Sequence, residues 1–490
     1  MKIWLVSHGY PPEFVGGTEL YVRRLAEALA KGGHEVAVVA GSMHWFHEDR
    51  VAEETVDGIR VVHIHRSDPY HDRWDKSFSP SVSALFDGLL AEGKPQLVHV
   101  HHWMRLSRDL VEVARRRRIP AVVSLHDLWT TCLRLDRNLD QEVFCERPLE
   151  PAPCATCVGG ARPWTGAGEM AEAARLFRDD VLNELRVARR RIVPTRSHGE
   201  RIAAALDLDP KSFTVLPNGS IAELARAPRH KRVEGLLRVG HWGSLYATKG
   251  VHVLLEAVAR ARHRDRIEVH LYGAISSEDY GERLRALSEG LRVVFHGPYS
   301  ASDLPAASFD VVVLPSLAAE SYSFALDEAL ALGYPVVASD FGALGDRLGK
   351  DGRRFPRGDR AALAAILDDL AEHPKALAEM THPRAPQPFD EHAKELVRIY
   401  GEVLAEGKPP ASSSFDEQAH LAFLFRRGES LYRHALRYES LAHYTRDLSD
   451  DRDNRIKTIE SLEAKIADLE RKLAEAKQGN GAPERKPPAP

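Results

Sequence analysis

Short apolar runs rich in valine and isoleucine alternate, along the first 220 residues, with longer segments of helical period. This alternation is typical of βαβ units in a parallel sheet. A helix between the first two runs should end at the Gly-Gly pair 32–33, because glycine stops helices. The expected strands are residues 2–7, 35–40, 59–64, 96–100, 121–125, 191–194 and 213–217.

The same pattern begins again after a polar, arginine-rich segment at residues 221–234. We therefore expect a first α/β domain at 1–220, a linker at 221–234 and a second α/β domain at 235–385. The strands expected in the second domain are residues 235–240, 266–273, 292–297, 309–315 and 335–340.

Beyond residue 385 the strand pattern stops, which predicts a helix at 386–406, a helical extension at 415–477 and a disordered tail at 478–490. Within the extension, apolar residues repeat at spacings of three and four: Ile459, Leu462, Ile466, Leu469 and Leu473. Isoleucine alternating with leucine favours a parallel coiled-coil homodimer through residues 455–477. About two heptads are marginal for association, so a solvated single helix is the alternative.

Charge and composition narrow the class of protein. The 67 basic and 71 acidic residues nearly balance, which argues against a nucleic-acid binder. The N-terminus lacks the long apolar core of a secretion signal, and no segment is apolar enough to span a bilayer, so we expect a cytoplasmic protein.

The four cysteines are too few for a disulfide framework, and all lie in one segment: Cys132, Cys145, Cys154 and Cys157. A C-x2-C pair after two earlier cysteines suits a tetrahedral structural zinc, which would hold the segment that follows the strand at 121–125. Four unpaired thiols clustered by chance are the alternative reading.

The segment ESYSFALDEALALGYPVVASDFG (320–342) carries the most specific chemical signal. Glu320 and Glu328 stand at the start of a predicted helix, where the backbone N–H groups of residues 321–324 would be unpaired. Such a helix N-terminus favours a diphosphate. Acidic residues are also common in first helical turns without any function, so the spacing alone leaves both readings open.

Together with the loop PPEFVGGTE, the strand GHEVAVVA and the turn GSLYATKG, this segment resembles the retaining glycosyltransferases of family 4 over about residues 1–405. The resemblance implies the GT-B fold: two Rossmann-like domains facing each other across a cleft, with a nucleotide-sugar donor held mainly by the second. It also implies that a helix near 389–405 crosses back to brace the first domain. A Rossmann dehydrogenase is disfavoured because the first turn, HGYPPEFVGG, lacks G-x-G-x-x-G.

The resemblance assigns catalytic roles to three residues. It implies that His126 lies near the reacting carbon, that Glu320 lies beside hydroxyls of the transferred sugar, and that Lys249 neutralises the departing diphosphate. His101 and His102, after the preceding strand, are acceptor-side or structural candidates facing the same cleft.

The remaining candidates would bind the donor. Glu328 would hold the ribose hydroxyls, and both carboxylates are expected to be ionised acceptors. Glycines would let the backbone approach the phosphates. The donor-binding candidates are Gly16, Gly17, Ser244, Ser321, Tyr322, Ser323, Phe324 and Glu328.

Two positions depart from the family pattern. Ser244 stands where family members commonly carry an arginine, a loss of about 1.5 to 3 kcal/mol of charge stabilisation. Ser323 replaces a glycine of the E-x7-E loop. No catalytic metal is expected, because the lysine and the helix N-terminus take the place of a cation.

The sequence thus predicts a retaining, hexosyltransferase-type enzyme that moves a sugar from a nucleotide-sugar donor to a glycan, lipid-linked or small-molecule acceptor. Ser244 and the helical extension suggest the alternative, a catalytically weak sugar-nucleotide-binding or scaffolding subunit. No nucleic-acid partner is expected, while a homodimer and peripheral contact with a membrane are left open.

Overall fold

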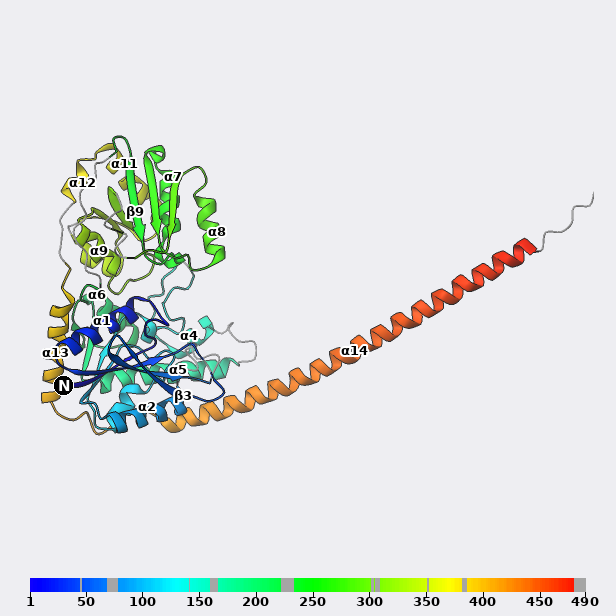
Figure 1. Cartoon of the computed structure of the whole chain (residues 1–490), viewed down its shortest axis with the longest axis horizontal. Helices are drawn as coiled ribbons and strands as arrows, with labels where there is room; N and C mark the ends of the chain where they lie inside the picture. The colour runs from blue at the N-terminus through cyan, green and yellow to red at the C-terminus, as the bar shows by residue number, and fades with distance from the viewer. Residues whose placement is uncertain are drawn as a thin grey trace, which may run out of the picture. The chain divides into compact units, whose positions relative to one another are not determined.

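The computed structural model describes residues 1–44, 46–67, 78–140, 142–158, 166–221, 233–300, 304, 309–349, 352–380 and 386–479. Residues 1–417 form one compact unit that contains two α/β domains, each built on its own sheet (Figure 1). The expected fold class, two Rossmann-like domains followed by a helical extension, is confirmed.

The first sheet has eight strands in the order β3-β4-β2-β1-β5-β6-β7-β8. All neighbours pair in parallel except β3 with β4, which are antiparallel. The chain order reverses at β1, between β2 and β5, as in a doubly wound sheet. The strands are β1 (Lys2–Ser7), β2 (Glu35–Gly41), β3 (Arg50–Val56), β4 (Ile59–His65), β5 (Leu97–Val100), β6 (Ala121–Ser124), β7 (Arg190–Val193) and β8 (Thr214–Val215).

The second sheet is wholly parallel, in the order β11-β10-β9-β12-β13-β14. Its order reverses between β9 and β12, which opens a crevice at the carboxyl ends of these two strands. The strands are β9 (Leu237–Trp242), β10 (Ile267–Tyr272), β11 (Arg292–Gly297), β12 (Val311–Leu314), β13 (Val336–Ser339) and β14 (Gly352–Phe355).

Helices cover both faces of the second sheet. Side chains alternate along a strand, so Val311 and Val313 enter a core with α7 and α11, whereas Val312 and Leu314 enter a second core with α9 and α10.

The helices of both domains and of the extension are α1 (Gly17–Lys31), α2 (Pro80–Gly93), α3 (Leu110–Arg116), α4 (Pro151–Val158), α5 (Ala167–Val187), α6 (Arg196–Leu206), α7 (Val251–Arg260), α8 (Glu278–Leu287), α9 (Phe324–Leu332), α10 (Ala343–Leu348), α11 (Arg360–Glu372), α12 (Ala376–Glu379), α13 (Phe389–Ala405) and α14 (Glu417–Gly479).

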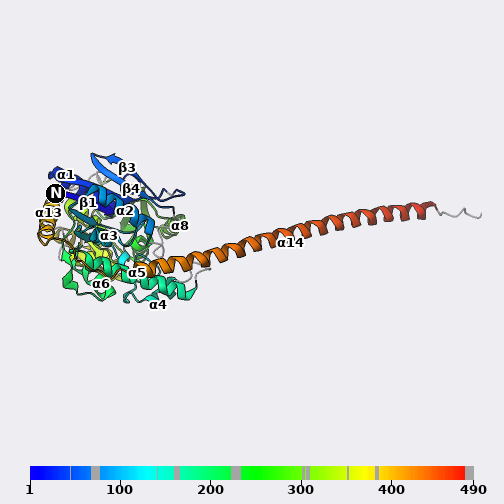
Figure 2. The same ribbon diagram turned by 90° about the horizontal axis from the view of Figure 1, so that it is seen from below.

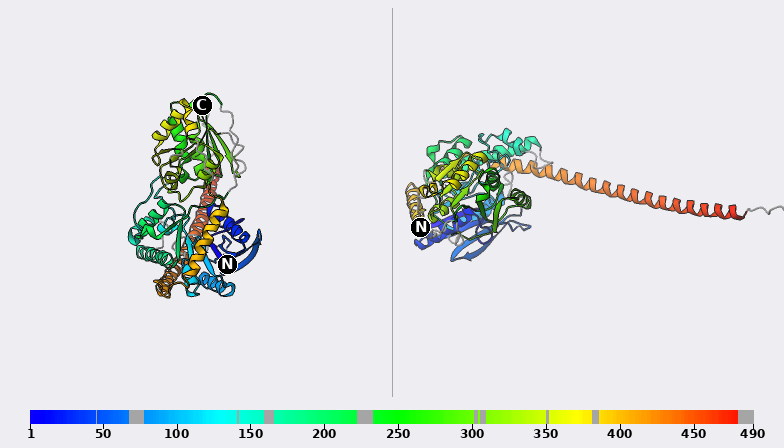
Figure 3. Two further views of the ribbon diagram at one scale, coloured as in Figure 1. Left: turned by 90° about the vertical axis from the view of Figure 1, so that its left-hand side faces the viewer. Right: turned by 90° about the horizontal axis from the view of Figure 1, so that it is seen from above.

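Helix α13 follows the second domain in sequence but packs in the core of the first. It lies against α1, as Figure 3 shows. Two buried polar contacts fix it there: His392 Nε2 lies 2.5 Å from Tyr21 Oη, and Tyr400 Oη lies 2.6 Å from His99 Nδ1. The chain therefore returns to the first domain, through α13, after it has formed the second.

Two of the described strands, β3 and β14, were not predicted from the sequence pattern. The sequence of β3, RVAEETV, is mostly exposed, and β14, GRRF, has two arginines and one apolar residue. Both lie at the edge of their sheet, where one side of the strand has no partner and polar residues are tolerated. Most of the expected linker, residues 222–232, and the end of the expected tail, 480–490, lie outside the described residues, while Gln478 and Gly479 belong to α14.

The second unit begins at Gln418 and consists, within the described residues, of helix α14 from its second residue onward. This helix is 63 residues long and continuous (Figure 2), with a charged surface that carries many exposed apolar side chains. Along the described ranges, no helix is long and apolar enough to cross a lipid bilayer.

Candidate active site

A cavity of about 780 Å³ opens at the crevice between β9 and β12 and reaches the first domain. The first domain contributes the end of the loop after β1, the start of α1 and His126, two residues after β6. The second contributes strand ends and the start of α9. Of the candidates predicted from sequence, the cavity is lined by Gly16, Gly17, His126, Ser244, Lys249, Glu320, Ser321, Tyr322, Ser323, Phe324 and Glu328.

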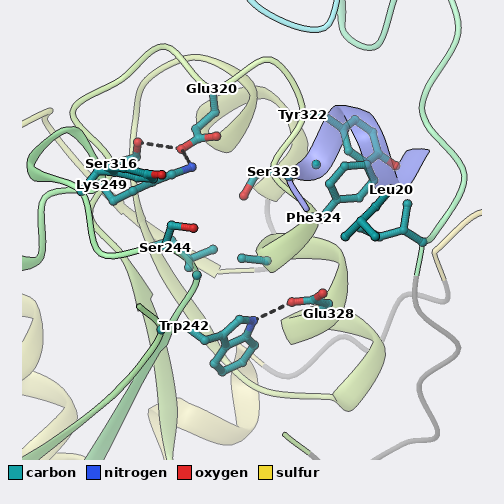
Figure 4. Close-up of a pocket in the computed structure, with 18 of the residues that line it drawn as sticks. Leu20, Trp242, Ser244, Lys249, Ser316, Glu320, Tyr322, Ser323, Phe324 and Glu328 are labelled. Carbon is teal, nitrogen blue, oxygen red and sulfur yellow. Dashed lines mark hydrogen bonds and ion pairs between the residues drawn. The ribbon is translucent and has the colours of Figure 1, made fainter. Parts of the chain in front are cut away.

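Lys249 and Glu320, 71 residues apart in the chain, form an ion pair on one side of the cavity (Figure 4). Lys249 Nζ donates to Glu320 Oε1 at 2.6 Å, and Ser316 Oγ donates to the same oxygen at 2.9 Å. Burial disfavours the charged carboxylate, but the ammonium and these hydrogen bonds outweigh it and hold the pKa of Glu320 below its usual value. Glu320 is therefore ionised at neutral pH.

A glycine places the lysine. Lys249 ends the 3-10 turn Ala247–Lys249, and Gly250 follows with φ +73°, in the left-handed region. A Cβ atom at this position would lie 2.0 Å from the carbonyl oxygen of Pro315, at the end of β12. The close approach of these two backbone segments brings the lysine beside the strand end that carries Ser316, and only glycine permits it.

The segment between the two carboxylates is not helical at its start. Helix α9 begins at Phe324, so Glu320 precedes it by four residues, and the expected helix beginning at Glu320 is wrong. Ser323 has φ +70° and makes no side-chain capping hydrogen bond. Arg347 donates to the carbonyl oxygens of Tyr322 at 2.6 Å and Ser323 at 3.1 Å, which holds this bend in place. The first N–H groups of α9 thus lack a side-chain cap where they meet the cavity.

Glu328 lies on the opposite side of the cavity from the ion pair, with Ser244 between them in Figure 4. Its Oε2 accepts a hydrogen bond from Trp242 Nε1 at 2.8 Å. Burial raises the pKa of Glu328 to about 7, although the indole bond opposes the shift. Glu328 is thus partly protonated at neutral pH in the free protein.

His126, after β6, is linked to both domains. Its Nε2 lies 3.0 Å from His101 Nδ1, and its carbonyl oxygen accepts a hydrogen bond from Ser321 Oγ at 2.5 Å. Burial lowers the pKa of His126 to about 3, so the ring is neutral. His101 and His102 were expected to face the cleft, but neither is among the described residues that line the cavity. His101 lies behind His126, and His102 pairs with Asp127 at 3.2 Å.

The glycine loop approaches the start of α9 from the first domain. Gly16 precedes α1 and Gly17 is its first residue. A Cβ at Gly16 would lie 2.6 Å from Glu19 Oε2, whereas one at Gly17 would meet Phe324 at an ordinary 3.5 Å. A side chain at Gly16 would therefore require the Glu19 carboxylate to move, whereas one at Gly17 would not.

Residues that sequence reasoning missed stand next to strand ends. Trp242 ends β9, Ser316 follows β12 by two residues, and His241 also lines the cavity. Thr195, which follows β7 by two residues, donates from Oγ1 to the carbonyl oxygen of Ser321 at 3.0 Å. These residues could have been predicted from their position, because ligands bind at the carboxyl ends of parallel strands in open α/β sheets.

Among the described residues that line the cavity, no second cation takes the place of the arginine that is absent at position 244. Lys249 is the only lysine or arginine among the described residues that line the cavity. A diphosphate bound here would meet one ammonium group and the N-terminus of α9.

The four thiols are unpaired and lie in the segment after His126. Cys154 and Cys157 stand one turn apart on α4. Burial raises the thiol pKa of Cys132 and Cys154, and Cys145 lies near enough to raise both further. Nevertheless, in the part of the chain that is described, no three or more His, Cys, Asp or Glu side chains are arranged to hold a metal ion. The expected zinc site thus stays a prediction, without geometric support.

The same segment contacts the second domain through Glu142. This carboxylate forms an ion pair with Arg360 of α11 at 2.8 Å and lies 3.3 Å from His252 Nε2 of α7. Phe144 adds an edge-on contact with Phe341, at 5.1 Å between ring centroids. The cysteine-bearing segment therefore spans the two domains.

Comparisons with known proteins agree with the two-domain fold. Residues 15–220 match the family described as Glycosyltransferase Family 4, and residues 237–373 match Glycosyl transferases group 1. The chain is 25% identical to glycogen synthase of Mycobacterium tuberculosis over 402 residues, which cover 77% of this chain and 87% of that protein. It is also 25% identical to phosphatidyl-myo-inositol mannosyltransferase of Mycobacterium leprae over 421 residues, 83% of this chain and 98% of that one.

Among solved structures, sucrose-phosphate synthase from Thermosynechococcus elongatus shares the fold, with a TM-score of 0.60 at 19% identity over 83% of this chain and 100% of that one. These similarities favour an enzyme over the scaffolding alternative. The chain therefore belongs to the family 4 glycosyltransferases, enzymes of the GT-B fold that transfer a sugar from a nucleotide-sugar donor to an acceptor.

Proposed function

We propose that transfer occurs in the cavity between the two domains and retains the anomeric configuration through attack on the face from which the leaving group departs. The observation that carries this proposal is the placement of Lys249, Glu320 and Glu328 around one cavity at the start of α9. The donor diphosphate would lie between Lys249 and the uncapped N–H groups of α9, where both the ammonium and the helix dipole favour negative charge.

Donor binding would rearrange the ion pair. In the free protein Lys249 is neutralised by Glu320. An arriving diphosphate competes for the ammonium, and the released Glu320 oxygen becomes available to accept hydrogen bonds from the hydroxyls of the donor sugar. One carboxylate thus stabilises the lysine in the empty site and orients the sugar in the filled one.

In the chemical step the bond between the anomeric carbon and the phosphate oxygen breaks, and its electron pair stays on the diphosphate. The acceptor oxygen forms a bond to the same face of that carbon, and its proton passes to the departing phosphate oxygen. The products are the glycoside and the nucleoside diphosphate. Lys249 and the start of α9 stabilise the charge that grows on the diphosphate, which is the main catalytic contribution.

His126 would act as a neutral hydrogen-bonding group near the reacting carbon. Its low pKa excludes a permanent positive charge at that position. Because Nε2 is engaged by His101, Nδ1 is the ring nitrogen available to the substrate. Glu328 would bind the ribose hydroxyls through Oε1, since Trp242 occupies Oε2.

The test is transfer by the purified chain. A panel of nucleotide sugars is first screened for thermal stabilisation, because a ligand that binds only the native state raises its stability. Release of the nucleoside diphosphate from the selected donor is then measured with candidate acceptors. Glu320→Gln and His126→Ala should abolish most transfer without unfolding the chain, whereas Glu328→Ala should mainly weaken donor binding. Full kcat in Glu320→Gln would refute the assignment.

The cellular setting is also a proposal. Four free thiols suit a reducing compartment, so we place the enzyme in the cytoplasm. The Mycobacterium leprae relative is named for a lipid acceptor, phosphatidyl-myo-inositol. A lipid-linked acceptor would bring the present enzyme to a membrane surface. Co-flotation with vesicles, with and without the acceptor lipid, tests this contact.

A further inference from the structure

Helix α14 carries a row of exposed apolar side chains that is longer than the two heptads visible at its end. From residue 438 to residue 473 the row fits one unbroken heptad repeat. The apolar side chains occupy its a and d positions and are each 50% to 64% exposed: Tyr438, Leu441, Leu448, Ile459, Leu462, Ile466, Leu469 and Leu473. An exposed a/d row of this length is typical of a coiled-coil seam, the name used below for these a and d positions.

Three seam positions are polar: Thr445, Arg452 and Arg455. The two arginines are held on the surface of their own helix, Arg452 by Asp453 at 2.9 Å and Arg455 by Asp451 at 2.9 Å. They divide the seam into an upstream part at 438–448 and a downstream part at 459–473.

We propose that a second copy of this chain covers the seam, so that two α14 helices form a parallel, in-register coiled coil over residues 438–473. The downstream part has isoleucine at a (459 and 466) and leucine at d (462 and 469), the combination that favours two parallel strands. In-register pairing aligns the two arginine layers with each other, whereas a shift by one heptad would set arginines against apolar layers.

The flanking charges select the parallel orientation. Lys465 and Lys472 occupy g positions, and Glu463 and Glu470 occupy e positions. In a parallel pair each g residue faces the e residue of the next heptad on the other helix, so Lys465 meets Glu470 of the second copy. In an antiparallel pair e faces e and g faces g, so Lys465 would not meet Glu470 of the second copy and this attraction would be lost.

Glu470 is well suited to this role. Its neighbours three and four residues away on its own helix are Ile466, Ala467, Leu473 and Ala474, none of which is basic. Its charge is therefore not satisfied along its own helix and is available to the lysine of a second chain.

Sedimentation velocity of the full chain over a range of concentrations tests the assembly. We expect the mass of a dimer. Ile466→Lys places a charge in the seam of both helices and should raise the dissociation constant by about a hundredfold or more. Ala464→Lys, the same new side chain on the outer face of the helix, is the matched control and should leave the dimer unchanged. A monomer at every concentration, a larger oligomer, or no effect of Ile466→Lys would overturn the proposal.

Charge exchange tests the orientation. Glu470→Lys should weaken the dimer, because it sets lysine against Lys465, and the double variant Lys465→Glu with Glu470→Lys should restore it. In an antiparallel pair residue 470 does not face Lys465, so a dimer that is unchanged or tighter in Glu470→Lys would refute the parallel arrangement. Replacing both seam arginines, Arg452→Ile with Arg455→Leu, should tighten the dimer, and a weaker dimer would refute the register.

Discussion

Removal of the Lys249 ammonium group should slow sugar transfer more than it weakens donor binding. A charge-assisted hydrogen bond to the diphosphate contributes about 1.5 to 3 kcal/mol. Because about 1.36 kcal/mol corresponds to a tenfold change in rate, Lys249→Ala should lower kcat/KM by about 10- to 150-fold. Most of the loss should appear in kcat, since the charge on the diphosphate grows as the glycosidic bond breaks.

The structure indicates why no neighbour should compensate for this loss. Lys249 is the single lysine or arginine among the described cavity residues, and Ser244 leaves the other expected cation site neutral. Adding Ser244→Arg to Lys249→Ala should therefore restore part of the rate, because the new guanidinium would extend into the same cavity. Lys211→Ala, which removes an exposed lysine outside the cavity, serves as the matched control.

The substitution also leaves Glu320 without its ion-pair partner. Glu320 would keep the hydrogen bond from Ser316, but burial would raise its pKa once the ammonium is gone. Adding Glu320→Gln to Lys249→Ala removes this unpaired charge and should restore any thermal stability that Lys249→Ala loses, without restoring the rate.

The assay is steady-state release of the nucleoside diphosphate, with donor affinity measured separately by calorimetry. A kcat/KM for Lys249→Ala within about twofold of the parent enzyme would refute the reasoning. A loss of kcat/KM that came only from a higher KM would also refute it, because the lysine would then bind the ground state and the transition state equally.

Three further outcomes are expected. Donor affinity should rise about tenfold from pH 6 to pH 8 as Glu328 loses its proton, since the pKa of that carboxyl is about 7, and calorimetry should find no such rise in Glu328→Gln. Gly250→Ala should lower the melting temperature more than Gly58→Ala, because both have positive φ but only Gly250 faces a backbone oxygen, and equal losses would contradict this. Elemental analysis should find about one zinc per chain, lost in Cys154→Ser with Cys157→Ser, whereas a metal-free active enzyme with four titratable thiols would exclude the zinc site.

The two sheets were predictable because central parallel strands are buried on both faces and therefore read as continuous apolar runs. Among the strands in the described part of the chain, the two that were missed, β3 and β14, both lie at sheet edges. In β3 five of the seven residues RVAEETV are exposed, so its composition resembles that of a loop. The short helix α4 was also missed, because its sequence, PAPCATCV, has two prolines and little helical periodicity.

Many of the residues that line the cavity could be predicted from the sequence, but the contacts between them could not. Similarity to a family identified Lys249, Glu320 and Glu328, yet nothing local in the sequence shows that the lysine pairs with a carboxylate 71 residues later. That contact depends on the sheet order, which places β9 beside β12. The shifted pKa of Glu328 likewise depends on burial that only the tertiary structure creates.

The hydrogen bond between Trp242 and Glu328 gives the enzyme an optical reporter of its own. The indole is 1% exposed and its N–H points at the carboxyl that would receive the donor ribose. Occupation or ionisation of that carboxyl changes the electric field at the ring and should shift its emission. Intrinsic fluorescence could then follow donor titration without label, acceptor or turnover, and the signal should vanish in Trp242→Phe while the six other tryptophans still emit.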